Sequence, residues 1–130
     1  MTDAALTERV QGFLMAHIDS IEKLEVLLLL RARTEREWTA AEVALELRIN
    51  EDSATARLND LAASGLLIGN AGKIERYRYS PVSSEDVRAI AELATAYAAR
   101  RVSVITFIFS KPQTRVQGFA DAFLLKRRRD

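Results

Sequence analysis

The sequence predicts a mainly α-helical fold with a small β-hairpin, and two observations favour this fold class. Apolar residues recur at steps of three and four through most of the 130-residue chain, which is the spacing of amphipathic helices. One short stretch, 66–79, instead has an apolar run, a glycine-containing turn and then alternating residues over 74–79, which is typical of a hairpin. We therefore expect one domain in three parts: an N-terminal helical arm over 1–19, a core over 20–81 and C-terminal helices over 84–130.

Composition argues against several classes of protein, those that depend on cysteines, on a secretory signal or on a membrane span. The chain has no Cys, which excludes disulfides, thiolate metal sites and a Cys nucleophile. Residues 1–6 lack the basic region of a secretory signal. The longest apolar run, 26–30, is far shorter than the roughly 20 residues that cross a bilayer. We therefore expect a cytoplasmic protein with no membrane partner.

The first two predicted helices follow each other closely. Helical spacing of apolar residues runs from residue 6 to residue 18 and resumes from 21 to about 33. Asp19 or Ser20 is the expected cap between the two segments. The first segment is expected to form the arm, and the second a core helix.

The next two helices are short and separated by a tight turn. Thr39 and Glu42 have the spacing of a capping box, so a helix should begin there. Asn50 is the expected N-cap of the following helix, which runs from about 51 to 64 and stops at Gly65. Two short helices with so few residues between them indicate a helix-turn-helix unit.

A β-hairpin is predicted directly after this unit. It comprises a strand, a turn and a second strand, over 66–68, 69–72 and 74–79. Alternation along the second strand directs Tyr77 and Tyr79 toward the core. The intervening Arg76 and Arg78 should then face solvent.

The C-terminal part is expected to begin with a helix capped by Ser83 and Asp86. Because 102–109 is rich in strong β-formers, a strand over those residues remains an alternative. A continuous apolar stripe nevertheless favours one long helix, through Val87, Ala91, Ala94, Ala98, Val102, Ile105 and Phe109. A last amphipathic helix is predicted from the apolar residues Val116, Phe119, Ala120, Phe123 and Leu124.

One part of the chain resembles a known family. The stretch from Trp38 to Pro81 contains WTAAEVALELRINEDSATARLNDLAASGLL and, further on, GKIERYRYSP. It resembles the winged helix-turn-helix domains of bacterial transcriptional regulators of the MarR-like and related groups. The resemblance covers roughly residues 20–81, and it implies a winged helix-turn-helix with extra N- and C-terminal helices.

In such regulators the third helix enters the major groove, while basic wing residues touch the minor groove or phosphates. Carried over by position, the resemblance assigns a recognition-helix set: Ser53, Thr55, Ala56, Arg57 and Asn59. It likewise assigns a wing set: Lys73, Arg76 and Arg78. The implied partner is double-stranded DNA, and the implied function is that of a DNA-binding transcriptional regulator.

The charge pattern keeps a second hypothesis open, that of a winged-helix adaptor that binds another protein and no DNA. Residues 1–65 carry 7 basic and 12 acidic side chains, whereas residues 66–130 carry 12 and 6. The third helix holds one Arg against Glu51, Asp52 and Asp60, and duplex phosphates repel acids. Acids in a first helical turn also favour the helix dipole, which is their ordinary structural role.

The chain has more apolar helical surface than the core over 20–81 requires, which predicts a homodimer with two-fold symmetry. The expected interface residues are Phe13, Val102, Ile105, Phe109, Val116, Phe119 and Phe123. The alternative is that these helices pack only on their own domain.

No pattern indicates an enzyme. His17 is the single histidine and has no companion metal ligand. Carboxylate pairs such as Glu22 with Glu25 fall on predicted exposed helix faces, and the glycine-containing turns lack a phosphate-loop motif. We therefore expect no catalytic residue, no metal site and no cofactor.

Overall fold

A computed structural model describes residues 6–70 and 72–110 of the chain. These residues form six α-helices and one two-stranded antiparallel sheet, so the predicted mainly helical class with a hairpin is confirmed. In chain order the elements are α1 (Glu8–His17), α2 (Ile21–Ala32), α3 (Ala40–Leu47), α4 (Glu51–Ala63), β1 (Leu67–Asn70), β2 (Arg76–Tyr79), α5 (Ser84–Ala99) and α6 (Arg101–Phe109).

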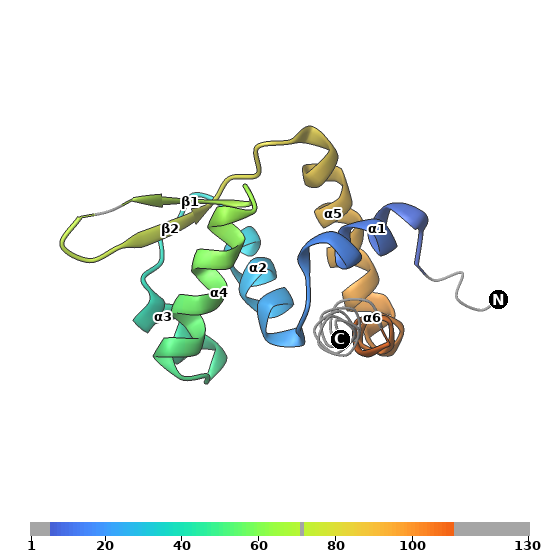
Figure 1. Cartoon of the computed structure of the whole chain (residues 1–130), viewed down its shortest axis with the longest axis horizontal. Helices are drawn as coiled ribbons and strands as arrows, with labels where there is room; N and C mark the ends of the chain where they lie inside the picture. The colour runs from blue at the N-terminus through green and yellow to red at the C-terminus, as the bar shows by residue number, and fades with distance from the viewer. Residues whose placement is uncertain (1–5, 71, 111–130) are drawn as a thin grey trace, which may run out of the picture.

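The elements form two groups on either side of α2 (Figure 1). At one end lie α3, α4 and the hairpin, and at the other end α1 packs with α5 and α6. The side chains of Leu24, Leu27 and Leu30 on α2 are completely buried. Since α2 packs against α3, α4 and β2, it joins the helix-turn-helix and the hairpin into one core.

Polar caps place the helix starts, as the sequence predicts. Ser20 is the cap between α1 and α2, and its side chain accepts a hydrogen bond from the Lys23 backbone N–H. Thr39 and Glu42 form both hydrogen bonds of the capping box. Asn50 and Ser83 cap α4 and α5 in the same manner. These bonds satisfy N–H groups that have no partner within the helix.

The predicted single long C-terminal helix was wrong, because the chain breaks at Arg100. Its backbone angles, φ −137° and ψ 58°, lie outside the helical region and separate α5 from α6. Residues 102–109 are helical, so the strand alternative does not hold. The β-forming residues adopt a helix because tertiary packing overrides their weak local preference.

The apolar stripe predicted for this region is not the face that packs inward. Val87, Val102 and Phe109 are 46%, 76% and 67% exposed. The buried side chains of α5 and α6 instead are Ala89, Ile90, Leu93, Tyr97, Val104 and Ile108. On α5 this face carries the larger side chains, so burying it removes more apolar area from water than burying the alanine-rich face.

The hairpin is confirmed, but its turn lies further along the chain than predicted. Leu67 pairs with Tyr79 and Asn70 pairs with Arg76, so Gly69 and Asn70 belong to β1 rather than to the turn. A third segment joins the sheet at Trp38, whose backbone exchanges two 2.8 Å hydrogen bonds with Tyr77. The segment that leads into α3 is thereby attached to the hairpin.

The predicted last helix, with Val116, Phe119 and Phe123, lies outside the described residues. Within the ranges 6–70 and 72–110, no helix is both long and apolar enough to cross a membrane.

Candidate nucleic-acid interface

The turn between α3 and α4 is made by residues 48–50. Arg48 adopts a left-handed conformation, with φ 59° and ψ 47°, which reverses the chain after α3. The Ile49 backbone N–H then donates to the Ala44 carbonyl at 3.0 Å. Helix α4 begins directly afterwards, so the two helices are held by a short and well-bonded turn. Sequence reasoning did not single out Arg48.

Helix α4 presents one face to the core and the other to solvent. Ala54, Leu58 and Leu61 are completely buried, which sets the rotation of the helix. Among the five recognition-helix residues predicted from the sequence, Ala56 and Asn59 are exposed. Ser53, Thr55 and Arg57 are half-buried. The predicted set therefore lies on and beside the outward face.

Arg57 is held by an ion pair to α2. Its Nε lies 2.9 Å from Oε1 of Glu22, and both side chains are 29% exposed. A second pair joins the same two helices, since Lys23 Nζ lies 3.8 Å from Oδ2 of Asp60. An acid of α2 thus pairs with a base of α4, and a base of α2 with an acid of α4, so both pairs join the two helices. The sequence alone did not indicate these partners, which lie 35 and 37 positions apart.

Asn59 is held from the other side by the hairpin. The Tyr77 hydroxyl donates to Asn59 Oδ1 at 2.5 Å. Burial, together with the nearby Glu75 carboxylate, raises the pKa of Tyr77 to about 12, so the hydroxyl stays protonated and able to donate well above neutral pH. This contact links the wing to α4 and leaves the Asn59 side-chain NH₂ as the group available to a ligand.

The solvent face of α4 is otherwise acidic. Glu51 and Asp52 are exposed in the first turn, and the Asp60 side chain is 56% exposed despite its contact with Lys23. Arg57 is the one basic residue among the 13 of α4. Arg57 is therefore the one side chain of α4 that carries a positive charge.

Basic charge gathers on the hairpin instead. Lys73 and Arg76 are exposed, and Arg78 is half-buried. Within the described part of the chain, no ion pair engages any of the three, although the Arg76 charge contributes to lowering the pKa of Glu42. Tyr77 between the two arginines is 2% exposed, which confirms the predicted inward tyrosine. The wing thus offers cations that are not committed to ion pairs.

Comparison with known proteins shows which of them share this arrangement. No protein-family model and no curated protein sequence matches the chain. Solved structures do: an apo form of Lactococcus lactis ZitR is 21% identical and has a TM-score of 0.50, covering 95% of this chain and 93% of that one. A MepR mutant of S. aureus, bound to an oligodeoxyribonucleotide, is 10% identical with a TM-score of 0.55, covering 90% and 86%.

The chain has the fold of these winged-helix regulators. The MarR-like resemblance of the sequence is therefore confirmed as a winged helix-turn-helix fold, with α3 and α4 as the helix-turn-helix and β1 and β2 as the wing. The agreement is not confined to the helix-turn-helix and the wing, since at least 90% of this chain is covered in both comparisons.

The residues predicted to form a dimer interface differ in their exposure to solvent, among those that the structure describes. Phe13 is only 5% exposed and packs in the core of its own chain, 4.7 Å from the His17 ring, so it does not offer a surface to a partner. Val102 and Phe109 on α6 are 76% and 67% exposed, with half-buried Ile105 between them. These three form the α6 apolar stripe.

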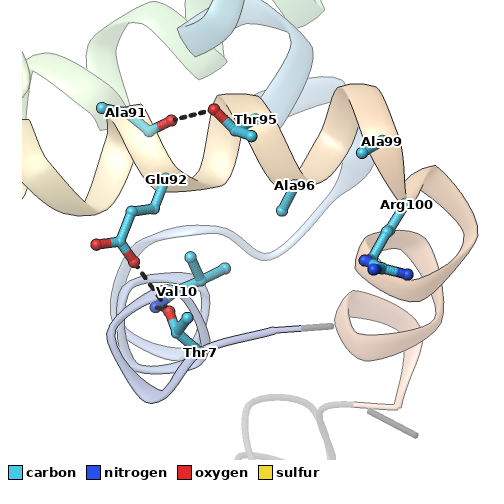
Figure 2. A pocket seen from close by; sticks show the side chains of 8 residues that line it. All are labelled: Thr7, Val10, Ala91, Glu92, Thr95, Ala96, Ala99 and Arg100. Carbon is cyan, nitrogen blue, oxygen red and sulfur yellow. Dashed lines mark hydrogen bonds between the residues drawn. The ribbon is translucent and has the colours of Figure 1, made fainter. Parts of the chain in front are cut away.

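A groove of about 630 Å³ lies between α1 and α5 of the winged-helix chain (Figure 2). Its floor is made of small side chains, and Thr7 and Glu92 close one edge through a 3.0 Å hydrogen bond. Arg100 stands at its other end. Arg9 binds Glu92 and Glu85 at 2.7 and 2.9 Å, so α1 is clamped to α5 beside this groove.

Among the described residues no cluster of His, Asp or Glu side chains is suited to hold a metal ion.

Proposed function

We propose that this chain is a DNA-binding transcriptional regulator that acts as a homodimer and has no enzymatic activity. The observation that carries the proposal is the combination of a helix-turn-helix with an adjacent arginine-bearing wing. The MepR mutant bound to an oligodeoxyribonucleotide has the same fold, which supports a regulator role for this chain. Helix α4 would enter the major groove, and the wing would contact the backbone or the minor groove.

The wing supplies the principal electrostatic attraction in this proposal. Lys73, Arg76 and Arg78 meet phosphates, while exposed Ala56 and the oriented amide of Asn59 face the base edges. Ser53 and Thr55 reach the flanks of the same groove. The acidic first turn of α4 weakens binding, so the affinity depends more on the wing than on the recognition helix.

The homodimer follows from the α6 apolar stripe, formed by Val102, Ile105 and Phe109. A two-fold axis beside α6 pairs the same surface of two chains, because a symmetric interface is self-complementary. The two α4 helices would then address half-sites about 34 Å apart on one side of the duplex. The two-fold symmetry predicts a palindromic binding sequence.

The test is binding of the purified chain to mixed-sequence duplex DNA at several salt concentrations, with Arg76→Ala and Arg78→Ala combined. Removal of two phosphate contacts should weaken binding and flatten the slope of log K against log salt by about 1.8. Arg88→Ala with Arg100→Ala removes two exposed cations from α5 and from the break that follows it, and is the matched control. Equal slopes for wing variant and wild type would refute the role of the wing.

A second candidate is favoured by one observation, the acidic outward face of α4. Under this hypothesis the winged helix binds another protein through that face and does not bind DNA. The same titration separates the two functions. Absence of DNA binding even at low salt, together with a specific protein partner in a pull-down that Asp52→Lys abolishes, would establish the adaptor.

A further inference from the structure

We propose that Glu22 competes with DNA phosphate for Arg57 and thereby limits the affinity of the recognition helix. This inference rests on the proposed DNA-binding function. Arg57 is the sole cation of α4, and its guanidinium donates to the Glu22 carboxylate at 2.9 Å. A phosphate oxygen accepts from a guanidinium in the same geometry as a carboxylate, so the two compete for the same N–H groups.

The exposure of the pair makes the competition possible. Both side chains are 29% exposed, so a phosphate can approach without unfolding either helix. Its neighbour behaves differently, because the Lys23 side chain is only 9% exposed in its contact with Asp60. The cation of the Lys23–Asp60 pair is therefore enclosed, whereas the Arg57 guanidinium is accessible to a phosphate that could displace Glu22.

Helix α4 retains its position when a phosphate replaces Glu22 as the partner of Arg57. Completely buried Leu58 and Leu61 anchor it, Lys23 still contacts Asp60, and the Tyr77 hydroxyl still binds Asn59. Replacement of Glu22 by a phosphate therefore moves side chains and leaves the helix in place. Exchange is also incomplete, because a released Glu22 carboxylate would lie beside the phosphate that displaced it.

The competition predicts that the two residues are coupled in DNA affinity. Removing the Glu22 charge frees Arg57 to add one phosphate contact, whereas removing Arg57 deletes a contact that is already attenuated. A simple loss of negative charge would instead raise affinity equally whether or not Arg57 is present. A double-mutant cycle separates these two effects.

The experiment measures binding of the full chain to one mixed-sequence duplex across a salt series, for wild type, Glu22→Gln, Arg57→Ala and the double variant. We expect E22Q to bind about five- to tenfold more tightly, with a salt slope steeper by about 0.9. R57A should lie within about threefold of wild type. The double variant should match R57A, and thermal unfolding of each protein confirms that it is folded.

The outcomes distinguish this inference from the function on which it rests. If wild type binds DNA and E22Q binds no better, the competition is wrong and the DNA-binding function stands. Equal tightening with and without Arg57 also refutes the competition. If none of the four proteins binds, both proposals fail. If E22Q does not fold, Glu22→Ala is measured in its place, and failure of both to fold would assign the pair to stability and overturn the inference.

Discussion

Tyr77 shows how one side chain serves the core and the candidate interface together. Its ring is buried, its backbone pairs with Trp38, and its hydroxyl binds Asn59 on α4. A buried hydroxyl that lost its partner would bear the cost of desolvation, so the bond to Asn59 stabilises the packing of wing on helix. The same bond orients the amide that we propose faces the DNA bases.

We predict that Tyr77→Phe lowers the free energy of unfolding by about 1 kcal/mol, because one hydrogen bond is lost while the ring remains. For a domain of this size the midpoint temperature should fall by about 3 to 5 °C. Circular dichroism during heating measures the change. In an Asn59→Ala background the same substitution should have a smaller effect, and an equal effect there would contradict the assigned contact.

At the scale of single elements, helix starts follow their caps, whereas the break between α5 and α6 has no such signal. Helix α6 has no side-chain cap, and the break residue Arg100 is neither Gly nor Pro. The cap of α3 is the most complete, because Thr39 and Glu42 bond each other reciprocally. The Thr39 backbone N–H holds the pKa of Glu42 below its ordinary value of 4.5, and Arg36 at 3.6 Å adds to the effect.

This depressed pKa predicts how stability depends on pH. A carboxyl whose pKa is lower in the folded state stabilises the fold fully above its unfolded pKa, and this contribution is lost as pH falls through the folded pKa. Glu42→Gln removes the titrating group. Its midpoint temperature should therefore fall less than that of wild type between about pH 6 and pH 3. Calorimetry measures both midpoint temperatures at each pH, and the difference between the two proteins at pH 7 serves as the reference. A difference that stays constant from pH 6 to pH 3 would count against the prediction.

At the scale of the whole molecule, the two candidate surfaces lie at opposite ends. The helix-turn-helix and wing occupy one end, and α1, α5 and α6 occupy the other, with α2 between them (Figure 1). Glu25 on α2 accepts hydrogen bonds from Tyr97 and Arg101, at 3.0 and 3.2 Å, so the second group is also attached to the central helix. Helix α2 therefore contacts both groups of elements.

We predict that wild type is a dimer in solution and that Val102→Glu with Phe109→Glu yields a monomer with weaker DNA binding. Two charges in an apolar interface cost more than the contact they replace. Light scattering during gel filtration measures the mass. Met15→Glu with Val82→Glu is the matched control, since these residues are 48% and 86% exposed and lie outside α6, the helix-turn-helix and the wing. A monomeric wild type, or a dimeric double variant, would overturn the assigned surface.

Sequence by itself determined helices α1 to α4, the caps of α2 to α5, the hairpin and the helix-turn-helix, because these depend on local spacing and on side chains that bond nearby backbone. Ser20, Thr39, Asn50 and Ser83 each bond backbone within three residues. The five candidate recognition residues and three wing residues were likewise named from sequence, and their contacts with DNA remain a prediction.

Only the tertiary structure decided which α5 face is buried, that Phe13 is internal, and that Arg57 and Asn59 already have partners. Two faces of α5 have helical periodicity, and only packing against α1 and α2 selects the one with Ile90 and Leu93. The contacts of Arg57 with Glu22 and of Asn59 with Tyr77 join residues 35 and 18 positions apart. Such pairs leave no local pattern, because they depend on which helices and strands the completed fold brings together.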